Sequence, residues 1–459
     1  MYRRLYFIGI IAYIIMLFYS VLFYKERIIF LDTSFSLFHI IKDRFFSIQV
    51  YRFGDIFNQL LPVLATRAKL PVNDLMISYS LGYMIYYFLC YFICGSILKR
   101  YDFALTILLL NVLFVSGTFY WITSQLPQSM ALLMLTLAYA CNTQPANAKP
   151  ARSLVLVTAL ITLAFFHPLL VFVMLYAVIF FTQESEVFSP PAKILLHVMA
   201  LIYFATLLLK ALIFSTPYER SAMSGMKNFI TQFPDYFTLY SNKRFLTNCV
   251  TEYYWIPLLF ACIVIYYAKA GKWKNLWLFL SFFLGYLLLI NVSYPTSVTP
   301  PFYIESLYLP LSIFLALPFV FDILPVLEKK KLALPMVSLI VLTGIVRLYS
   351  VRTTYSARLD HERKILDKYG AVKVIAKAQK EDKDILQMLW GSPFELLLLS
   401  ECERNKPASI IIDDDPMLRQ SAYLIKNALV VNWDVYAYST LNPEYFHFTD
   451  TTTGYVIER

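Results

Sequence analysis

Long apolar runs fill most of the first 349 residues, and short polar segments separate them. A helix needs about 20 mostly apolar residues to cross the hydrocarbon core of a membrane. The runs that meet or approach this length are residues 5–24, 74–98, 103–120, 127–141, 153–166, 168–182, 192–214, 254–268, 275–291, 304–324 and 332–349. This pattern predicts an all-α polytopic membrane domain over residues 1–349, with about 11 transmembrane helices.

Two of these runs allow more than one interpretation. His167-Pro168 separates 153–166 from 168–182, and proline is a poor residue for a helix interior. Because each half is short, we expect a tight re-entry at the outer face there. The first run follows Arg3-Arg4 as a signal peptide would, but it is too long for a signal-peptide core and lacks a small-residue cleavage site. We therefore expect a permanent span.

The pattern changes after residue 349, where we expect a small mixed α/β extracytoplasmic domain over residues 350–459. A polar helix is predicted over 358–380, and an apolar-rich helix over 383–401 is interrupted near Gly391. Runs of β-branched and aromatic residues predict strands at 409–412, 429–431, 435–438 and 445–448. Asp413-Asp414-Asp415 after the first strand is either a divalent-ion site or a solvated turn.

Composition agrees with a membrane protein. Hydrophobic residues make up 59% of the 459 residues and charged residues only 15%, against about 25% charged in an average soluble domain. These values exclude a soluble enzyme, a disordered protein and a disulfide-stapled secreted module. The six cysteines show no metal-ligand spacing, and Cys90 and Cys94 share one face of an apolar helix, so we expect small buried hydrophobes and no zinc site.

Charge gives the expected orientation. Residues 1–349 carry 26 Lys+Arg and 14 Asp+Glu, whereas residues 350–459 carry 14 and 16. The excess of positive charge lies in alternate connections, at Arg3, Arg4, Lys99, Arg100, Lys149, Arg152, Lys193, Lys269, Lys272, Lys274, Lys329, Lys330 and Lys331. Positive loops stay in the cytoplasm. We thus predict a multi-pass cell membrane protein, compatible with a bacterial inner membrane, with a cytoplasmic N-terminus and an extracytoplasmic C-terminus. A nucleic-acid partner is not expected.

Two long connections, residues 25–73 and 215–253, then fall on the outer face with the C-terminal domain. Charge inside the spans is sparse. Lys210 and Arg347 lie near span ends, where long side chains are expected to reach the membrane interface.

Asp32 is the first candidate for chemistry. Asp32-Thr33-Ser34 directly precedes the apolar positions Phe35, Phe38, Ile41 and Phe45. One interpretation makes Asp32 the N-cap of an interfacial amphipathic helix. The other makes it a carboxylate that faces a cleft at the membrane surface, and the two are compatible.

The arrangement resembles the GT-C superfamily of membrane glycosyltransferases, the group of protein mannosyltransferases and aminoarabinose transferases in particular. The likeness covers the whole architecture: a first span, a long outer loop with Leu31-Asp32-Thr33, a second outer loop and an outer C-terminal domain. It implies an inverting transfer of a sugar from a polyprenyl-phosphate-linked donor to a glycan, lipid or protein acceptor. In that chemistry one carboxylate deprotonates the acceptor hydroxyl, and Asp32 is the expected catalytic base. No cofactor is expected, and a divalent metal stays open.

The departing phosphate would need cations. The outer loops offer Arg44, Arg52, Arg67, Arg220, Lys243 and Arg244. Arginine grips phosphate oxygens in a bidentate way, and we choose Arg52 and Arg220 as the donor contacts. Anchoring to anionic lipid headgroups explains the same residues.

Three further residues are candidate substrate contacts. Glu219 either forms a surface charge pair with Arg220 or faces the donor. His167 is either a hydrogen-bonded helix-end residue or part of the site. Glu305 opens the span at 304–324, and a carboxylate there is costly unless it points into a protein cleft. We expect it to contact substrate or to pair with an outer-loop arginine.

Two other classes of function stay open. The first is a non-catalytic transporter, flippase or scaffold protein in surface polysaccharide assembly. The second is a polymerase or ligase of surface polysaccharide, which usually concentrates its outer mass in a late loop. A transporter is expected to have ionisable groups deep inside its spans, whereas this chain has its acids at the outer boundary.

Overall fold

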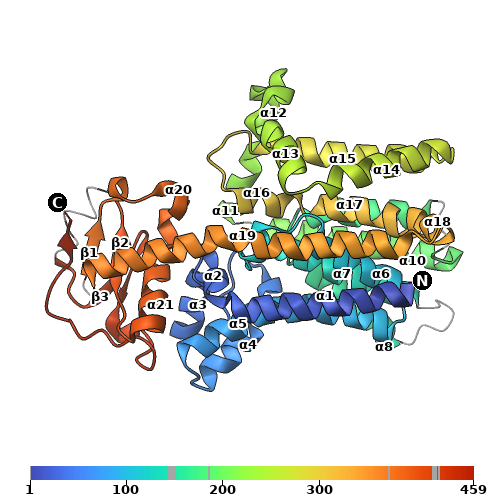
Figure 1. Cartoon of the computed structure of the whole chain (residues 1–459). Coiled ribbons are helices and arrows are strands. Elements are labelled where there is room, and N and C mark those ends of the chain that lie inside the picture. Colours follow the sequence, from blue (N-terminus) through green and yellow to red (C-terminus); the bar gives the residue numbers. More distant parts are fainter. Residues whose placement is uncertain are drawn as a thin grey trace.

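The computed structural model describes residues 2–142, 150–183, 187–214, 216–370, 373–415, 421 and 424–458, so Lys149 lies outside the described residues. It is mostly helical. A bundle of helices occupies one end of the molecule and a small domain with the strands the other, and the two termini lie at these opposite ends (Figure 1). The basic connections next to the N-terminus gather there as well: Lys272 pairs with Asp322 at 3.0 Å, and Tyr2 donates to the carbonyl of Val320 at 2.8 Å.

Several helices are long and apolar enough to cross a membrane, as expected for a multi-pass membrane protein. Among the described residues there are six: α1 (Tyr2–Leu22), α5 with its π-helical extension (Val72–Ile97), α10 (Pro190–Ile213), α15 (Trp273–Ser293), the run from α16 to α18 (Pro301–Lys329) and α19 (Ala333–Tyr369). The run from α16 to α18 is the most buried of them. It contains α16 (Pro301–Tyr308), α17 (Pro310–Pro318) and α18 (Leu324–Lys329).

The predicted number of 11 spans is not confirmed, because the remaining apolar helices are shorter. They are α6 (Tyr101–Val112), α7 (Gln125–Cys141), α8 (Pro150–Ala164), α9 (Leu170–Thr182) and α14 (Trp255–Lys269). The chain does break around His167-Pro168, between the ends of α8 and α9. The run predicted over 103–120 ends early, and an irregular loop, residues 113–124, follows α6.

Arg347 explains where α6 can end. It is buried in α19 rather than extended to the membrane interface, contrary to the prediction. Its guanidinium donates to the carbonyls of Val112, Leu113 and Val115 at 2.6–3.1 Å. Val112 is the last residue of α6, and the last carbonyls of a helix have no partner within it, so a cation from a neighbouring helix completes the end of α6 and the start of the loop after it.

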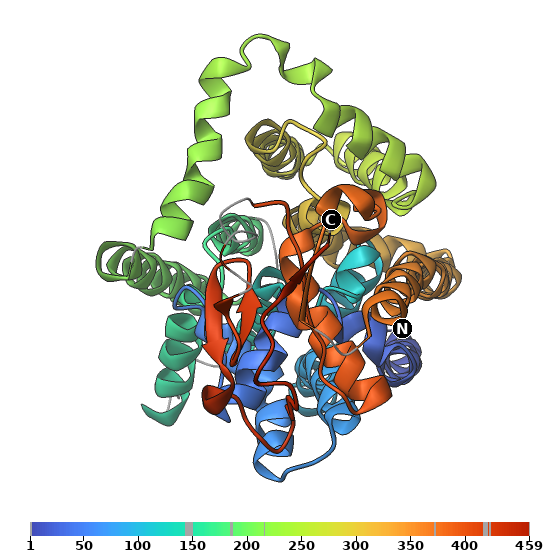
Figure 2. The ribbon, with the colours of Figure 1, turned by 90° about the vertical axis from the view of Figure 1, so that its left-hand side faces the viewer.

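The second outer connection forms α11 (Pro217–Met223), α12 (Asn228–Thr231) and α13 (Tyr240–Thr251). This light-green segment arches over one side of the molecule (Figure 2). Helix α13 meets α14 at a bend of 93°.

The first outer connection forms α2 (Tyr24–Ile28), α3 (Leu31–Asp43) and α4 (Ile56–Arg67). The N-cap of α3 is Phe30, and Asp32 lies in the first turn, so the predicted N-cap position of Asp32 is wrong. The predicted contact of the apolar face of α3 with the membrane interface is also wrong, because Leu37, Phe38 and Ile41 are fully buried against protein. Helix α21 (Ser392–Arg404) of the C-terminal domain covers α3.

The C-terminal domain is small and mixed α/β. A parallel sheet has the strand order β2-β1-β5, and β3 pairs with β4 in an antiparallel hairpin. The strands are β1 (Lys373–Ala376), β2 (Ser409–Ile412), β3 (Ala428–Val431), β4 (Asp434–Ala437) and β5 (Val456–Ile457). Besides α21, the domain contains the one-turn helix α20 (Lys383–Leu386).

Three of these strands confirm the predictions at 409–412, 429–431 and 435–438, but residues 445–448 form no strand. The helix predicted over 358–380 ends at Tyr369 and is the end of α19. Since α19 runs without a break through residue 349, no change in secondary structure marks the predicted domain boundary, which stays a prediction.

Candidate functional site

A cavity of about 1020 Å³ lies where both outer connections, the membrane helices and the C-terminal domain meet. Five of the six residues chosen from the sequence line it, although they come from separate parts of the chain: Asp32, Arg52, His167, Glu219 and Arg220. Glu305 does not line it. Exposed side chains such as Trp433 and Tyr218 stand among the lining residues, so the cavity reaches the surface.

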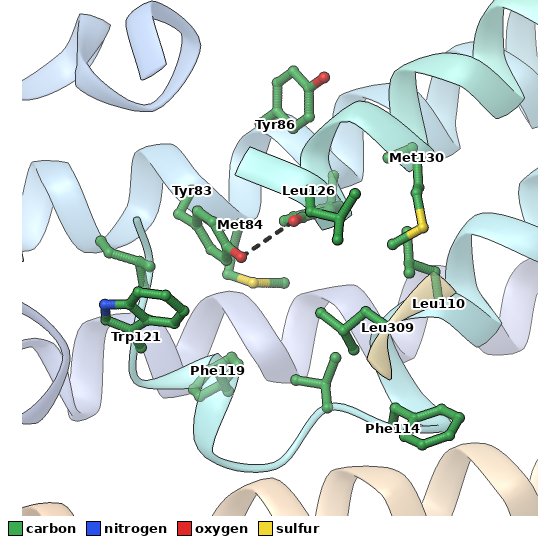
Figure 3. Close-up of a cluster of buried hydrophobic side chains, with 14 of the residues drawn as sticks. Tyr83, Met84, Tyr86, Leu110, Phe114, Phe119, Trp121, Leu126, Met130 and Leu309 are labelled. Atoms are coloured by element: carbon green, nitrogen blue, oxygen red, sulfur yellow. Dashed lines mark hydrogen bonds between the residues drawn. The ribbon is translucent and has the colours of Figure 1, made fainter. Parts of the chain in front are cut away.

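Asp32 lies in the cavity wall, and its carboxylate is held on one side. The indole Nε1 of Trp121 donates to its Oδ2 at 2.9 Å. Trp121 comes from the loop 113–124 and lies at the edge of a cluster of buried side chains with Phe119 and Tyr83 (Figure 3). Burial raises the pKa of Asp32, and the bond from Trp121 opposes that rise. A carboxylate of this kind is a stronger base than an exposed one and faces free space.

Glu305 has a different environment. Its carboxylate accepts the backbone N–H groups of Ser116, Gly117 and Thr118 at 2.7–3.1 Å. The hydroxyls of Thr118 and Tyr253 donate to it at 2.5 and 3.0 Å. The predicted pairing with an outer-loop arginine is absent from the described part of the structure. Glu305 instead holds the loop that carries Trp121 and therefore acts on Asp32 only at a distance.

Arg52 is oriented by a chain of polar groups. Its Nη1 donates to Gln125 Oε1 at 3.1 Å, and Gln125 Nε2 donates to Asp55 Oδ2 at 2.7 Å. The guanidinium lies 5.8 Å from the ring centre of Tyr218. Its Nε is buried and finds no hydrogen-bond acceptor among the described residues, so one donor of this cavity-lining guanidinium is unused. Burial raises the pKa of Asp55 to about 7, with Gln125 and Arg52 opposing the rise.

Lys210 is a cation that the sequence analysis assigned to the membrane interface. It lies in the last turn of α10, its side chain is only 4% exposed, and it lines the cavity. Its ammonium group is 3.7 Å from the carboxylate of Glu219. Glu219 thus pairs with Lys210, which also lines the cavity, and not with its sequence neighbour Arg220. Arg220 forms no ion pair within the described residues. Arg220 is exposed at the rim.

His167 occupies the break between α8 and α9. Its Nδ1 accepts the backbone N–H of Leu169 at 3.2 Å, as the helix-end interpretation expects. Burial lowers the pKa of His167, and the nearby charges of Arg52 and Lys210 lower it further. The ring is therefore neutral and presents its other nitrogen as a neutral hydrogen-bonding group.

The cavity has a chemically distinct wall that the sequence analysis did not assign. Apolar side chains of membrane helices form it, with Phe172 on α9, Leu207 on α10, and Leu289 and Ile290 on α15. Trp390 and Trp433 of the C-terminal domain also line the cavity. A tryptophan in the short polar gap between two predicted strands was a signal for Trp433 in the sequence, whereas nothing marked Trp390.

No group of three or more His, Cys, Asp or Glu side chains in the described chain is arranged to hold a metal ion. The Asp413–Asp415 segment is tied to the domain itself: Asp414 accepts the N–H of Ala378 at 3.0 Å, and Asp413 accepts from Asn432 at 2.7 Å.

The chain matches no family model, no curated protein and no solved structure. The resemblance to the GT-C superfamily therefore stays a prediction.

Proposed function

We propose that this protein is a membrane glycosyltransferase that moves a sugar from a polyprenyl-phosphate-linked donor to an acceptor. The observation that carries the proposal is the position of Asp32. Its carboxylate, held by Trp121 alone among the side chains described, lies in the wall of a large cavity that also contains cations and an apolar surface. This reaction needs a base for the acceptor hydroxyl, cations that bind the phosphate and an apolar surface for the lipid chain.

The proposed reaction is a direct displacement. Asp32 takes the proton of an acceptor hydroxyl, and the oxygen attacks the anomeric carbon from the side opposite the phosphate. The bond between that carbon and the phosphate oxygen breaks, and its electron pair leaves with the phosphate. The products are an inverted glycoside, a polyprenyl phosphate and a protonated Asp32, which returns its proton to water.

Cations near Asp32 would receive the phosphate. Arg52 offers its Nε, which is buried without a partner among the described residues, Lys210 lies in the cavity wall beside Glu219, and Arg220 stands at the rim. Charge-assisted hydrogen bonds to phosphate are each worth about 1.5–3 kcal/mol. They strengthen as negative charge develops on the leaving oxygen, which is the condition for faster reaction.

The apolar wall suits the lipid chain. Leu207 belongs to α10 and Leu289 to α15, two helices long enough to cross a membrane. A polyprenyl chain lying along them would bring its phosphate to the level of Lys210, in the last turn of α10. In this proposal the cavity lies on the outer face of a bacterial inner membrane, since the basic connections gather at the N-terminal end of the bundle.

The test compares Asp32→Asn with Asp43→Asn. Both changes remove one carboxylate from α3, but Asp43 is half-exposed beside Lys42 and does not line the cavity. Each protein is reconstituted in vesicles with polyprenyl-phosphate monosaccharides, labelled in the sugar and supplied one at a time. A total cell-envelope fraction serves as acceptor, and transfer of label is measured.

General-base assistance is worth about 10²–10⁴ in rate. Asp32→Asn is expected to transfer sugar at least about a hundredfold more slowly while binding polyprenyl phosphate like the parent. Asp43→Asn is expected to transfer at the parental rate. Equal turnover of both variants and the parent would remove Asp32 as the base, and no transfer from any donor by the parent would remove the proposed reaction.

A further inference from the structure

Three aromatic side chains form a cluster at the end of the cavity that belongs to the C-terminal domain. We call Phe35, Trp390 and Trp433 the aromatic platform. The ring centres of Trp390 and Trp433 are 5.2 Å apart, and that of Phe35 lies 6.4 Å from Trp390 and 6.1 Å from Trp433. All three residues line the cavity.

The platform is close to the proposed base. Phe35 follows Asp32 by three residues on α3, and residues at this spacing lie on the same face of a helix, about 5–6 Å apart. The edge of a ligand bound on the aromatic platform therefore lies within reach of the Asp32 carboxylate.

Trp433 is not explained by the fold. It is the second of the two residues, Asn432 and Trp433, that connect β3 to β4. Trp433 is 54% exposed, so an indole at this position adds little to the core and leaves a large apolar ring in the cavity mouth.

The polar atoms of the platform are also free. The indole N–H groups of Trp121 and Trp255 donate to Asp32 and Thr343. Those of Trp390 and Trp433 donate to no protein acceptor in the described part of the chain. Flat apolar faces with unused N–H donors at their edges suit a ligand that has one apolar face and a rim of hydroxyls.

We propose that the aromatic platform stacks a pyranose ring of the acceptor, which makes the acceptor a carbohydrate. This inference rests on the proposed function, because the ring is assigned to the acceptor on the ground that the platform lies beside Asp32, the proposed base. The C–H face of a pyranose packs on the exposed indole of Trp433, its hydroxyls meet the free N–H groups, and one hydroxyl extends to Asp32.

Two other occupants fit less well. A lipid chain has no hydroxyls for the indole donors, and the cavity already offers it the apolar wall with Leu207 and Leu289. The donor sugar must stay next to its phosphate, and two of the three candidate phosphate ligands, Lys210 and Arg220, belong to α10 and α11. The platform belongs instead to α3 and the C-terminal domain.

The test measures sugar binding without turnover. Methyl glycosides of glucose, galactose, mannose and N-acetylglucosamine are titrated against the full-length protein in nanodiscs by ligand-observed saturation-transfer NMR. Trp433→Ala is expected to weaken the best glycoside at least tenfold, and Trp433→Tyr to retain its affinity within threefold. Trp277→Ala is the matched control, because Trp277 is an exposed tryptophan of α15 outside the cavity and its loss should change nothing.

A second arm identifies the source of the sugar. Polyprenyl-phosphate monosaccharides are added to the glycoside complex. If the ring on the platform belongs to the acceptor, they bind without displacing the glycoside. Displacement by these donors, but not by polyprenyl phosphate, would assign the platform to the donor sugar and overturn the inference. Absence of binding by every glycoside, or an unchanged affinity in Trp433→Ala, would also overturn it.

The result is independent of the reaction. Asp32→Asn is expected to bind the glycoside like the parent. If Asp32→Asn still transfers sugar while Trp433→Ala loses glycoside binding, the assignment of the base fails and the platform stands. If Asp32→Asn loses transfer while Trp433→Ala keeps glycoside binding, the assignment of the platform fails and the assignment of the base stands.

Discussion

The regions around Asp32 and Glu305 both depend on the loop 113–124, but they use it in opposite ways. Glu305 accepts five hydrogen bonds, from three successive backbone N–H groups and from two hydroxyls. Among the described side chains Asp32 accepts one bond, from the indole of Trp121, and it lies in a cavity wall. A carboxylate whose lone pairs are all used holds structure, whereas one with free lone pairs can accept a proton from a substrate.

The two regions are also coupled. Glu305 fixes Ser116 to Thr118, and Trp121 follows three residues later. The extension of α19 supports the same loop, since the hydroxyl of Tyr355 donates to the carbonyl of Gly117 at 3.0 Å. The direction of the Asp32 carboxylate thus depends on residues far from the cavity.

The largest effect is expected from Glu305→Ala. This change leaves three buried N–H groups and two hydroxyls without their acceptor. Each unsatisfied group costs about 1–3 kcal/mol. Since the loop can recover part of this, we expect a loss of at least about 3 kcal/mol in the free energy of unfolding. Thermal unfolding in detergent measures it.

Asp32→Asn is the control for that experiment, with an expected change below about 1 kcal/mol because it removes no buried network. If both variants unfold alike, the distinction between a structural and an available carboxylate is wrong.

Asp55 sharpens the comparison, because it is a third buried carboxylate that lines the cavity, and Gln125 is the one side chain of the described residues that donates to it. Its pKa rises from 3.8 to about 7 on burial. The folded state therefore holds a proton that the unfolded state has already lost. The resulting stabilisation is complete below pH 3.8 and is lost as the pH rises to about 7, by at most about 1.4 kcal/mol per pH unit.

Unfolding midpoints of parent and Asp55→Asn between pH 4 and 8 test this sign. The parent is expected to lose stability relative to the variant as the pH rises through this range, and the difference should level off above about pH 7. A difference that is independent of pH would mean that Asp55 is ionised throughout.

Lys210 tests whether the cavity cations bind phosphate or only anchor the protein to lipid. Lys210→Gln is expected to weaken binding of polyprenyl phosphate about tenfold, the low end for a charge-assisted hydrogen bond. Lys243→Gln is the matched control, since Lys243 is an exposed outer lysine that does not line the cavity. Equal losses in the two variants, measured by native mass spectrometry, would favour unspecific attraction to anionic lipid.

The sequence predicted much of this arrangement because its signals are local. Apolar runs indicate membrane helices, and strands such as Ser409–Ile412 are short β-branched segments. Asp32, Arg52 and Arg220 could be chosen because they lie in the outer connections and their side chains suit a base and phosphate ligands.

Contacts between distant segments could not be predicted in this way. Lys210 and Arg347 both lie near span ends, where snorkelling is the usual outcome, yet both are buried. Lys210 lies beside Glu219 of the next helix, and Arg347 donates to carbonyls far away in the sequence, such as that of Glu252. Glu305 was correctly singled out as unusual, but its partners are backbone N–H groups that carry no residue identity. The predicted N-cap, Asp32, lies two residues after the observed one, Phe30. The reason is that the chain turns at Leu31, whose φ of +43° is a rare conformation for leucine.

That turn at Leu31 gives the smallest and most specific prediction. A Cβ added at Gly391 would lie 3.0 Å from the Cα of Leu31 and 2.9 Å from its Cδ2. Backbone atoms cannot move aside as a flexible side chain would, so Gly391→Ala should shift the start of α3 and with it Asp32. Small displacements of a base cost rate more than binding. We therefore expect kcat to fall several-fold while the affinity for polyprenyl phosphate stays unchanged. Gly285→Ala is the control, because no neighbouring atom lies within 4 Å of the added Cβ. A fall in phosphate affinity with unchanged kcat would show that the C-terminal domain positions the cations and not the carboxylate.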